Sequence, residues 1–228
     1  PLGAVLDAYG RVLGAVRMLH ARGVHHYDLK ADNFLCDRPT AADGDAGAAM
    51  DGAAAPACPD PASAAAPGVL VVADFGVATV TSRGADGRTP RDRGTECIKS
   101  PEMITFAMGG GPAGKQGAGG GAGGGAGGGD DFRRSDGSLT SAAAAACDVW
   151  SAGCLLYELV AGSHLFGGEE WGSFYIRLTG DSLELIPPAK AALLPQAYAQ
   201  PLLSFLGAVL QRDPKNRPTI SEVCRLFA

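Results

Sequence analysis

Two stretches rich in Gly and Ala place the strongest limit on what this chain can fold into. They cover roughly residues 38–68 and 107–146 and hold almost no large hydrophobic side chains. Such sequences bury too little apolar surface to offset the conformational entropy that is lost on ordering them. We therefore expect a single globular domain over residues 1–228, interrupted by two low-complexity insertions.

The remaining residues carry the hydrophobic periodicity of helices. Between Ala4 and Ala21 the apolar side chains recur at three- and four-residue steps, which predicts an amphipathic helix that ends at Gly23. The same pattern, divided by Gly and Pro, predicts four further helices over about 146–161, 169–178, 201–211 and 219–226. Most of the ordered chain is thus expected to be α-helical.

Two short apolar runs, Phe34–Cys36 and Val69–Val72, have the composition of strands. They flank the first insertion, so we expect an antiparallel hairpin whose connection is that insertion. The polar segment 79–97 predicts a long surface loop, and Pro101 predicts the start of a short helix. The predicted fold class is mostly α with a small β-hairpin.

Charge and cysteine usage exclude several function classes. The net charge is −5 with a pI near 5.3, and the short basic clusters at 88–93 and 133–134 are interpreted as solvated loops, so nucleic acid is not an expected partner. Six cysteines without a CxxC pair favour free thiols in a reducing, intracellular, cytoplasmic setting over a zinc site or disulfides. No signal peptide is visible, and the most apolar run, Val149–Ala161, is judged too short to cross a bilayer.

Polar side chains suited to phosphoryl transfer gather in two places. Asp28 and Lys30 alternate along a segment expected to be extended, and Asn33 directly precedes the first strand. Asp74 follows the second strand of the expected hairpin. Transfer of a phosphoryl group needs oxygen ligands for Mg²⁺, a cation near the phosphates and a carboxylate that orients the attacking hydroxyl. The Gly-rich tract 109–129 contains a GxGxxG pattern, but no strand precedes it and we assign it no phosphate-binding role.

The order of several motifs resembles the C-terminal lobe of the eukaryotic protein kinase family, of the Ser/Thr type, over nearly the whole chain. The matching segments, in chain order, are His26-Tyr27-Asp28-Leu29-Lys30-Ala31-Asp32-Asn33, Asp74-Phe75-Gly76, Gly94-Thr95, Ser100-Pro101-Glu102, Asp148-Val149-Trp150-Ser151-Ala152-Gly153, Arg212-Asp213-Pro214 and Asn216-Arg217-Pro218-Thr219. The resemblance implies a kinase that uses ATP and Mg²⁺ and modifies a protein substrate on Ser or Thr. Nothing in the sequence indicates an oligomeric state.

The resemblance also implies roles for individual residues. Asp28 would be the catalytic base, Lys30 the cation near the γ-phosphate, Asn33 and Asp74 the Mg²⁺ ligands, and Leu35 the floor under adenine. Thr95 would hydrogen-bond Asp28 and Lys30, although it can also be read as an ordinary loop hydroxyl.

Structural roles follow in the same way. His26 and Phe75 would stack on each other, Asp148 would brace the backbone of the catalytic loop, and Glu102 would pair with Arg217.

Tyr27 departs from the Arg that the family carries at this position. Without that guanidinium, the site lacks the cation that normally receives a phosphate on the loop, although Thr81 or Thr89 could still be phosphorylated. We therefore expect activity that is constitutive or controlled by other parts of the protein.

The sequence given contains no Gly-rich strand pair and no V-A-I-K lysine of the kinase N-terminal lobe. Two readings stay open at this stage. In the first, the chain is part of an active Ser/Thr kinase, and these 228 residues alone are inactive. In the second, it is a non-catalytic, kinase-like binding module.

Overall fold

The computed structural model describes residues 2–37, 69–80, 94–107, 140–180 and 183–228. Its helices, in chain order, are α1 (Leu2–Ala21), α2 (Pro101–Ala107), α3 (Ser141–Ala161), α4 (Trp171–Thr179), α5 (Pro188–Ala191), α6 (Ala199–Val209) and α7 (Ile220–Phe227). Its strands are β1 (Val24–His25), β2 (Phe34–Asp37), β3 (Val69–Val72) and β4 (Thr79–Val80). The predicted fold class, mostly α with a small hairpin, is confirmed.

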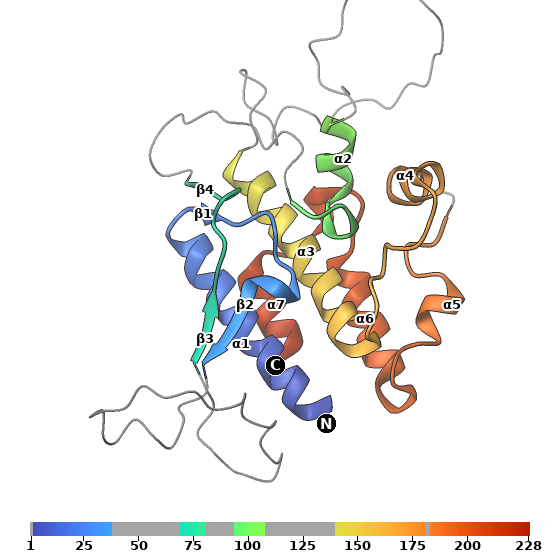
Figure 1. The fold of residues 1–228 in the computed structure, drawn as a ribbon, viewed down its shortest axis with the longest axis horizontal. Helices are drawn as coiled ribbons and strands as arrows, with labels where there is room; N and C mark the ends of the chain where they lie inside the picture. Colours follow the sequence, from blue (N-terminus) through green and yellow to red (C-terminus); the bar gives the residue numbers. More distant parts are fainter. Residues whose placement is uncertain (1, 38–68, 81–93, 108–139, 181–182) are drawn as a thin grey trace, which may run out of the picture.

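Helix α3 is the centre of the core. In Figure 1 it runs between α1 on one side and α6 on the other, and it contacts α1, α6 and α7. Trp150, Leu156 and Tyr157 on this helix are fully buried. The packing is close enough at Gly153 that a Cβ placed there would lie 2.9 Å from Leu210 Cδ2 and 3.0 Å from Val209 Cγ1.

Helix α3 begins earlier than the sequence indicated. We expected a start near Ala146, but the helix starts at Ser141, where the Thr140 side chain accepts a hydrogen bond from the Ala143 N–H. Alanine has the highest helix propensity, so the alanine run extends the helix instead of belonging to the insertion. The other residues of the two predicted insertions, 38–68 and 108–139, lie outside the described residues.

The earlier start also corrects the expectation that the apolar run is too short to cross a bilayer. With 21 residues and a mean hydropathy of 1.3, α3 is long and apolar enough to span one. However, 78% of its most apolar window is buried inside the protein. Its hydrophobic length therefore fills the core.

The predicted hairpin is confirmed. Strands β2 and β3 pair antiparallel, with Phe34 opposite Val72 and Asp37 opposite Val69. A second sheet was not predicted: Val24 in β1 pairs with Val80 in β4, and His25 with Thr79. These two-residue strands tie the segment before the catalytic loop to the start of the polar segment 79–97, of which residues 81–93 lie outside the described part.

Several smaller differences concern helix ends. Helices α1, α4, α6 and α7 lie within two residues of their predicted bounds at each end, and α2 starts at Pro101 as predicted. The four-residue helix α5 was not predicted, because so short a segment shows no periodicity.

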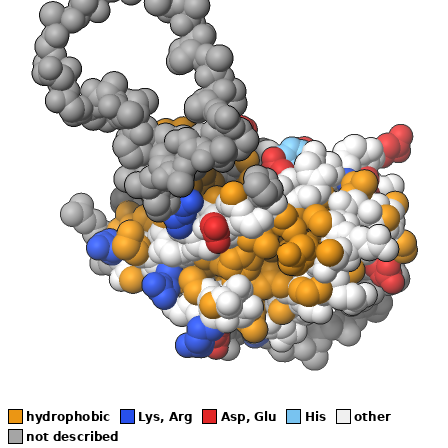
Figure 2. All heavy atoms as spheres, turned by 90° about the horizontal axis from the view of Figure 1, so that it is seen from below, with side chains coloured by type: hydrophobic (Ala, Val, Ile, Leu, Met, Phe, Trp, Pro, Cys, Tyr) orange, Lys and Arg blue, Asp and Glu red, His pale blue; other side chains and the backbone are white. Residues whose placement is uncertain are grey.

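Figure 2 shows a face of the molecule on which hydrophobic side chains form a broad area with charged side chains at its margin.

The close contact at Gly153 gives a test of the core packing. Gly153→Ala should lower the free energy of unfolding by about 1–2 kcal/mol, because the added methyl group overpacks against the buried Val209 and Leu210. Gly14→Ala in α1 is the matched control, since among the described residues nothing but its chain neighbours and the backbone of its own helix lies within 4 Å of the Cβ position. It should raise stability by about 0.5–1 kcal/mol through helix propensity alone. Urea unfolding measures the free energy of unfolding of each variant. An increase in both variants would contradict the packing described at Gly153.

Candidate active site

The buried carboxylate of Asp148 holds the segment that carries the predicted catalytic residues. One oxygen, Oδ1, accepts the Tyr27 N–H at 2.7 Å, and Oδ2 accepts the His26 N–H at 2.9 Å. The His20 Nε2 atom lies 2.8 Å from the same Oδ2. Because α3 is fixed in the core, these bonds fix the backbone at residues 26–27 relative to it. The predicted bracing role of Asp148 is confirmed in the geometry.

The predicted site residues Asp28, Lys30, Asn33 and Thr95 come together around one carboxylate. Asp28 Oδ1 accepts the Thr95 backbone N–H at 2.9 Å, and Asp28 Oδ2 lies 3.3 Å from Lys30 Nζ. The same Lys30 ammonium donates to Thr95 Oγ1 at 3.0 Å. Asn33 donates through Nδ2 to the Asp28 carbonyl at 2.8 Å and to Oδ2 at 3.2 Å. Thr95 is thus part of the cluster through both its backbone and its hydroxyl group.

These contacts set the charge state of Asp28. Burial opposes ionisation of the carboxyl group, but the hydrogen bonds from Thr95 and the positive charge of Lys30 outweigh burial and lower the Asp28 pKa below its ordinary value. At neutral pH the side chain is therefore a carboxylate that can accept a proton or a hydrogen bond.

Asp74 lies next to this cluster along the backbone. The Ala73 N–H donates to the Asn33 carbonyl at 2.8 Å, and His26 Nε2 lies 3.0 Å from the Ala73 carbonyl oxygen. The Asp74 backbone is left-handed, with φ of 57°, and its side chain is exposed. Asn33 and Asp74 thus both offer side-chain oxygens, which are the ligand type that Mg²⁺ prefers. The predicted stacking of His26 on Phe75 is confirmed, with ring centroids 5.0 Å apart.

Leu35 lies on the exposed face of the hairpin. Its exposed fraction is 56%, and its partner across the strands, Val71, is 45% exposed. Phe75 adds a third exposed apolar side chain close along the chain. These three side chains are exposed and apolar, and the role of Leu35 under adenine stays a prediction.

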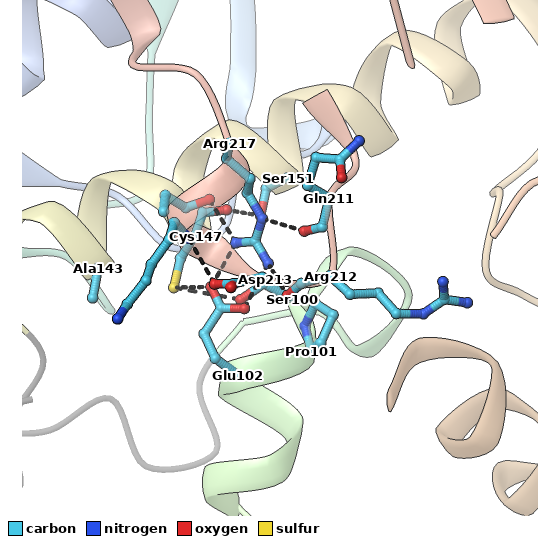
Figure 3. A network of polar contacts seen from close by, with 12 residues as sticks. Ser100, Pro101, Glu102, Ala143, Cys147, Ser151, Gln211, Arg212, Asp213 and Arg217 are labelled. Carbon is cyan, nitrogen blue, oxygen red and sulfur yellow. Dashed lines mark hydrogen bonds and ion pairs between the residues drawn. The ribbon is translucent and has the colours of Figure 1, made fainter. Parts of the chain in front are cut away.

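A second network secures the end of the polar segment at α2 (Figure 3). The Arg217 guanidinium binds Glu102 through two bonds, Nη1 to Oε1 at 2.6 Å and Nη2 to Oε2 at 2.7 Å. It also donates to the backbone carbonyls of Ala146 and Gln211 and lies 5.0 Å from the centre of the Trp150 ring. The predicted Glu102–Arg217 pair is confirmed, and its full set of partners offsets the cost of burying the arginine.

Sequence reasoning missed one polar cluster beneath the catalytic loop. Ligand-type atoms of His20, His25 and Asp148 lie within 4.8 Å of one another. Burial lowers the His25 pKa to about 4, despite the opposing charge of Asp148, so this imidazole is neutral at pH 7. Both Asp148 oxygens already accept N–H groups, so the cluster serves as a structural brace. Only the resemblance pointed to Asp148, and no sequence pattern marked His25.

Comparisons with known proteins find sequences and a fold to which this chain is similar. Residues 139–226 match the protein kinase domain family. A Dictyostelium discoideum protein described as a probable serine/threonine-protein kinase is 34% identical over 226 residues, 99% of this chain but 8% of the relative. The Mus musculus serine/threonine-protein kinase Nek4 is 30% identical over 78 residues, 34% of this chain and 9% of the relative. The chain thus spans less than a tenth of these relatives.

A solved structure of the Rad53 kinase domain and SCD2 in complex with AMPPNP has the same fold. The TM-score is 0.54 at 19% identity, and the match covers 97% of this chain and 57% of that one. Residues 139–226 thus match the protein kinase domain family, and the chain has the fold of a kinase domain over nearly its whole length. What it carries is the C-terminal lobe of the kinase fold, as the sequence motifs predicted.

Tyr27 gives this kinase lobe an unusual catalytic loop. Its side chain is 5% exposed and packs with Met103, Ala144 and Cys147, with Val77 at the edge of the cluster. Its hydroxyl oxygen accepts a 3.4 Å hydrogen bond from Thr79. In place of a cation at the surface, the kinase lobe has a buried aromatic contact between the catalytic loop and the elements around it.

The lowered pKa of Asp28 predicts a pH effect on stability. The ionised carboxylate contributes its full stabilisation above the pKa of the unfolded chain, near about 4. That contribution is lost as the pH falls through the lower pKa of the folded state. The unfolding free energy of wild type minus that of Asp28→Asn should therefore be constant from pH 7 to 5 and should decrease below a pH of about 4. Urea unfolding at each pH tests this, with the exposed Asp7→Asn as control; a constant difference down to pH 2 would contradict it.

The packing of Tyr27 predicts opposite outcomes for two substitutions. Tyr27→Phe removes one long hydrogen bond and should cost at most about 1 kcal/mol of unfolding free energy. Tyr27→Arg restores the family residue but buries a charge among apolar side chains, and should cost about 2 kcal/mol or more. Thermal unfolding compares the two. An arginine variant as stable as the phenylalanine variant would show that the site is open to solvent.

Proposed function

We propose that this protein is an ATP-dependent Ser/Thr protein kinase. The observation that carries the proposal is the shared contact of Lys30, Asn33 and Thr95 with one ionised carboxylate, Asp28. A lobe that served only to bind partner proteins would have no physical need to hold these side chains in contact with one carboxylate. Lys30 and Thr95, at the positions typical of Ser/Thr kinases, support Ser or Thr as the acceptor.

In this mechanism the Asp28 carboxylate accepts a hydrogen bond from the acceptor hydroxyl and directs its oxygen toward the phosphorus. Thr95 and Lys30 hold the carboxylate in position, and Lys30 also places a positive charge where negative charge develops. Asn33 and Asp74 are the residues that would hold Mg²⁺, and Leu35 would contact the adenine of ATP. When bound, Mg²⁺ neutralises charge on the phosphates.

A non-catalytic binding module is the second candidate. The exposed apolar side chains of Leu35, Val71 and Phe75 favour it, because such a surface can also bind a protein. We further propose an intracellular location, which the free thiols of Cys97, Cys147, Cys154 and Cys224 support.

Phosphate transfer from labelled ATP to a generic Ser/Thr protein tests the proposal. The assay should use the longest form of the protein that can be produced, because the 228 residues contain no Gly-rich strand pair of the kinase N-terminal lobe. Asp28→Asn should lower turnover about 10²- to 10⁴-fold, because the variant cannot accept the proton. Asp7→Asn, exposed on α1, should leave it unchanged.

Equal transfer by wild type and Asp28→Asn would overturn the assignment of Asp28. No transfer by wild type, together with binding of a partner protein, would favour the non-catalytic module. The 228-residue chain alone should transfer little or no phosphate.

A further inference from the structure

A second histidine lies beside the carboxylate that braces the catalytic loop. His20 at the end of α1, His25 in β1 and Asp148 in α3 each place one metal-ligating atom within 4.8 Å of the other two. The rings of His20 and His25 lie with their centroids 5.0 Å apart. A left-handed turn at Gly23, with φ of 69°, joins α1 to β1 and returns the chain toward the same carboxylate. Three elements that pack on one another thus bring these groups together.

The bracing of the catalytic loop does not by itself need His25. The backbone N–H groups of His26 and Tyr27 bind the Asp148 carboxylate. His20 Nε2 adds a third contact, 2.8 Å from Oδ2. The His25 side chain is buried, with 1% exposed, and burying a polar imidazole costs free energy that an apolar side chain would not. A ligand shared by the two histidines and the aspartate would offset that cost.

The donor atoms of this cluster select the ligand. Two imidazole nitrogens and one carboxylate oxygen suit Zn²⁺, whereas Mg²⁺ and Ca²⁺ prefer oxygen ligands alone. In a tetrahedral site, bonds of about 2.0–2.2 Å place neighbouring ligand atoms roughly 3.3–3.5 Å apart. The 2.8 Å contact between His20 and Asp148 has to widen by about 0.5 Å, and no other pair has to close by more than about 1.5 Å. Small side-chain rotations cover both distances.

A metal ion at this point leaves the brace in place. A carboxylate offers about four lone-pair positions, so it can keep both backbone N–H groups while the ion takes the place of the hydrogen between His20 Nε2 and Oδ2. The His20 imidazole then carries its proton on Nδ1. A ligating histidine usually hydrogen-bonds through its second ring nitrogen, and the Ser141 hydroxyl lies 3.1 Å from His25 Nε2. The His20 side chain is 9% exposed, which gives the ion a route from solvent.

We propose that His20, His25 and Asp148 bind one Zn²⁺ ion, with water at the fourth position. The ion joins the end of α1, strand β1 and helix α3 at the carboxylate that orients the catalytic loop. The site differs in chemistry from the Mg²⁺ site proposed for Asn33 and Asp74, which offers oxygen ligands. The inference goes beyond the proposed function and does not depend on phosphate transfer.

Metal titration of the 228-residue chain tests the site directly. After treatment with a chelator and its removal, calorimetry should show one Zn²⁺ bound per chain, also in the presence of excess Mg²⁺. Zn²⁺ at about 100 times its dissociation constant should raise the midpoint of thermal unfolding by about 5–10 °C. Co²⁺ in place of Zn²⁺ should give the visible absorption of a tetrahedral site. Its spectrum should have no thiolate charge-transfer band, because none of the three ligands is a cysteine.

Two variants should weaken Zn²⁺ binding. His25→Val keeps the contact of His20 with Asp148 and places a strand-forming residue in β1, and it should lower the affinity at least about 100-fold. Ser141→Ala removes only the hydrogen-bond partner of His25 and should lower the affinity about tenfold. Ser141 is exposed and the cap of α3 is Thr140, so this variant keeps the test valid if His25→Val does not fold. Circular dichroism shows whether each variant is folded.

Two further variants are matched controls. His164→Gln removes an exposed histidine that lies near Glu158, away from the cluster, and it should bind Zn²⁺ as wild type does. Asp74→Asn removes the carboxylate of the candidate Mg²⁺ site and should also leave Zn²⁺ binding unchanged.

The proposal would be overturned if wild type bound no Zn²⁺, or if the Co²⁺ spectrum contained a thiolate band. It would also be overturned by a Zn²⁺ affinity that His25→Val leaves unchanged, or that Ser141→Ala leaves unchanged where the valine variant is unfolded. An equal loss of affinity in His164→Gln or Asp74→Asn would place the ion elsewhere and would count against it as well.

Discussion

The carboxylate of Asp148 is the interaction on which the candidate site depends. It is fully buried, so leaving its charge without donors would cost several kcal/mol. The backbone N–H groups of His26 and Tyr27 supply two of those donors. Tyr27 must adopt a left-handed backbone with φ of 65°, which is unfavourable for an aromatic residue. The buried bonds offset this strain and fix the direction in which the chain enters Asp28.

Helix α3 connects this brace to the end of the polar segment. Asp148 faces the catalytic loop, while the neighbouring Cys147 accepts a hydrogen bond from Ser100 and donates one to Glu102. The Ala146 carbonyl accepts from Arg217, and the Ser151 hydroxyl donates to the Ile98 carbonyl. Because one rigid helix binds both segments, the catalytic loop and the Thr95–Pro101 region keep a fixed relation to each other. The contacts of Thr95 with Asp28 and Lys30 depend on that relation.

The sequence predicted those parts of the fold that are long or carry a motif. Helix α1 has a clear 3.6-residue period, and the hairpin strands β2 and β3 are continuous apolar runs, so both were found. The pairing of β1 with β4 could not be predicted, because strands of two residues have no measurable alternation. The start of α3 was misplaced because alanine repeats are common to helices and low-complexity sequence.

Tyr27 shows how one residue changes the forces that hold the kinase lobe together. An arginine at this position would bind a phosphate group on the loop through its charge and would release the loop when that phosphate is absent. Its contact would therefore be electrostatic and would depend on phosphorylation. The tyrosine ring contacts α2 through Met103 and α3 through Ala144 and Cys147, and burial of apolar surface does not depend on phosphorylation. Its hydroxyl also meets Thr79 at β4, where the polar segment begins. The start of that segment is therefore joined to the catalytic loop by packing and by the β1–β4 pairing. This favours a site that is formed without a phosphate switch.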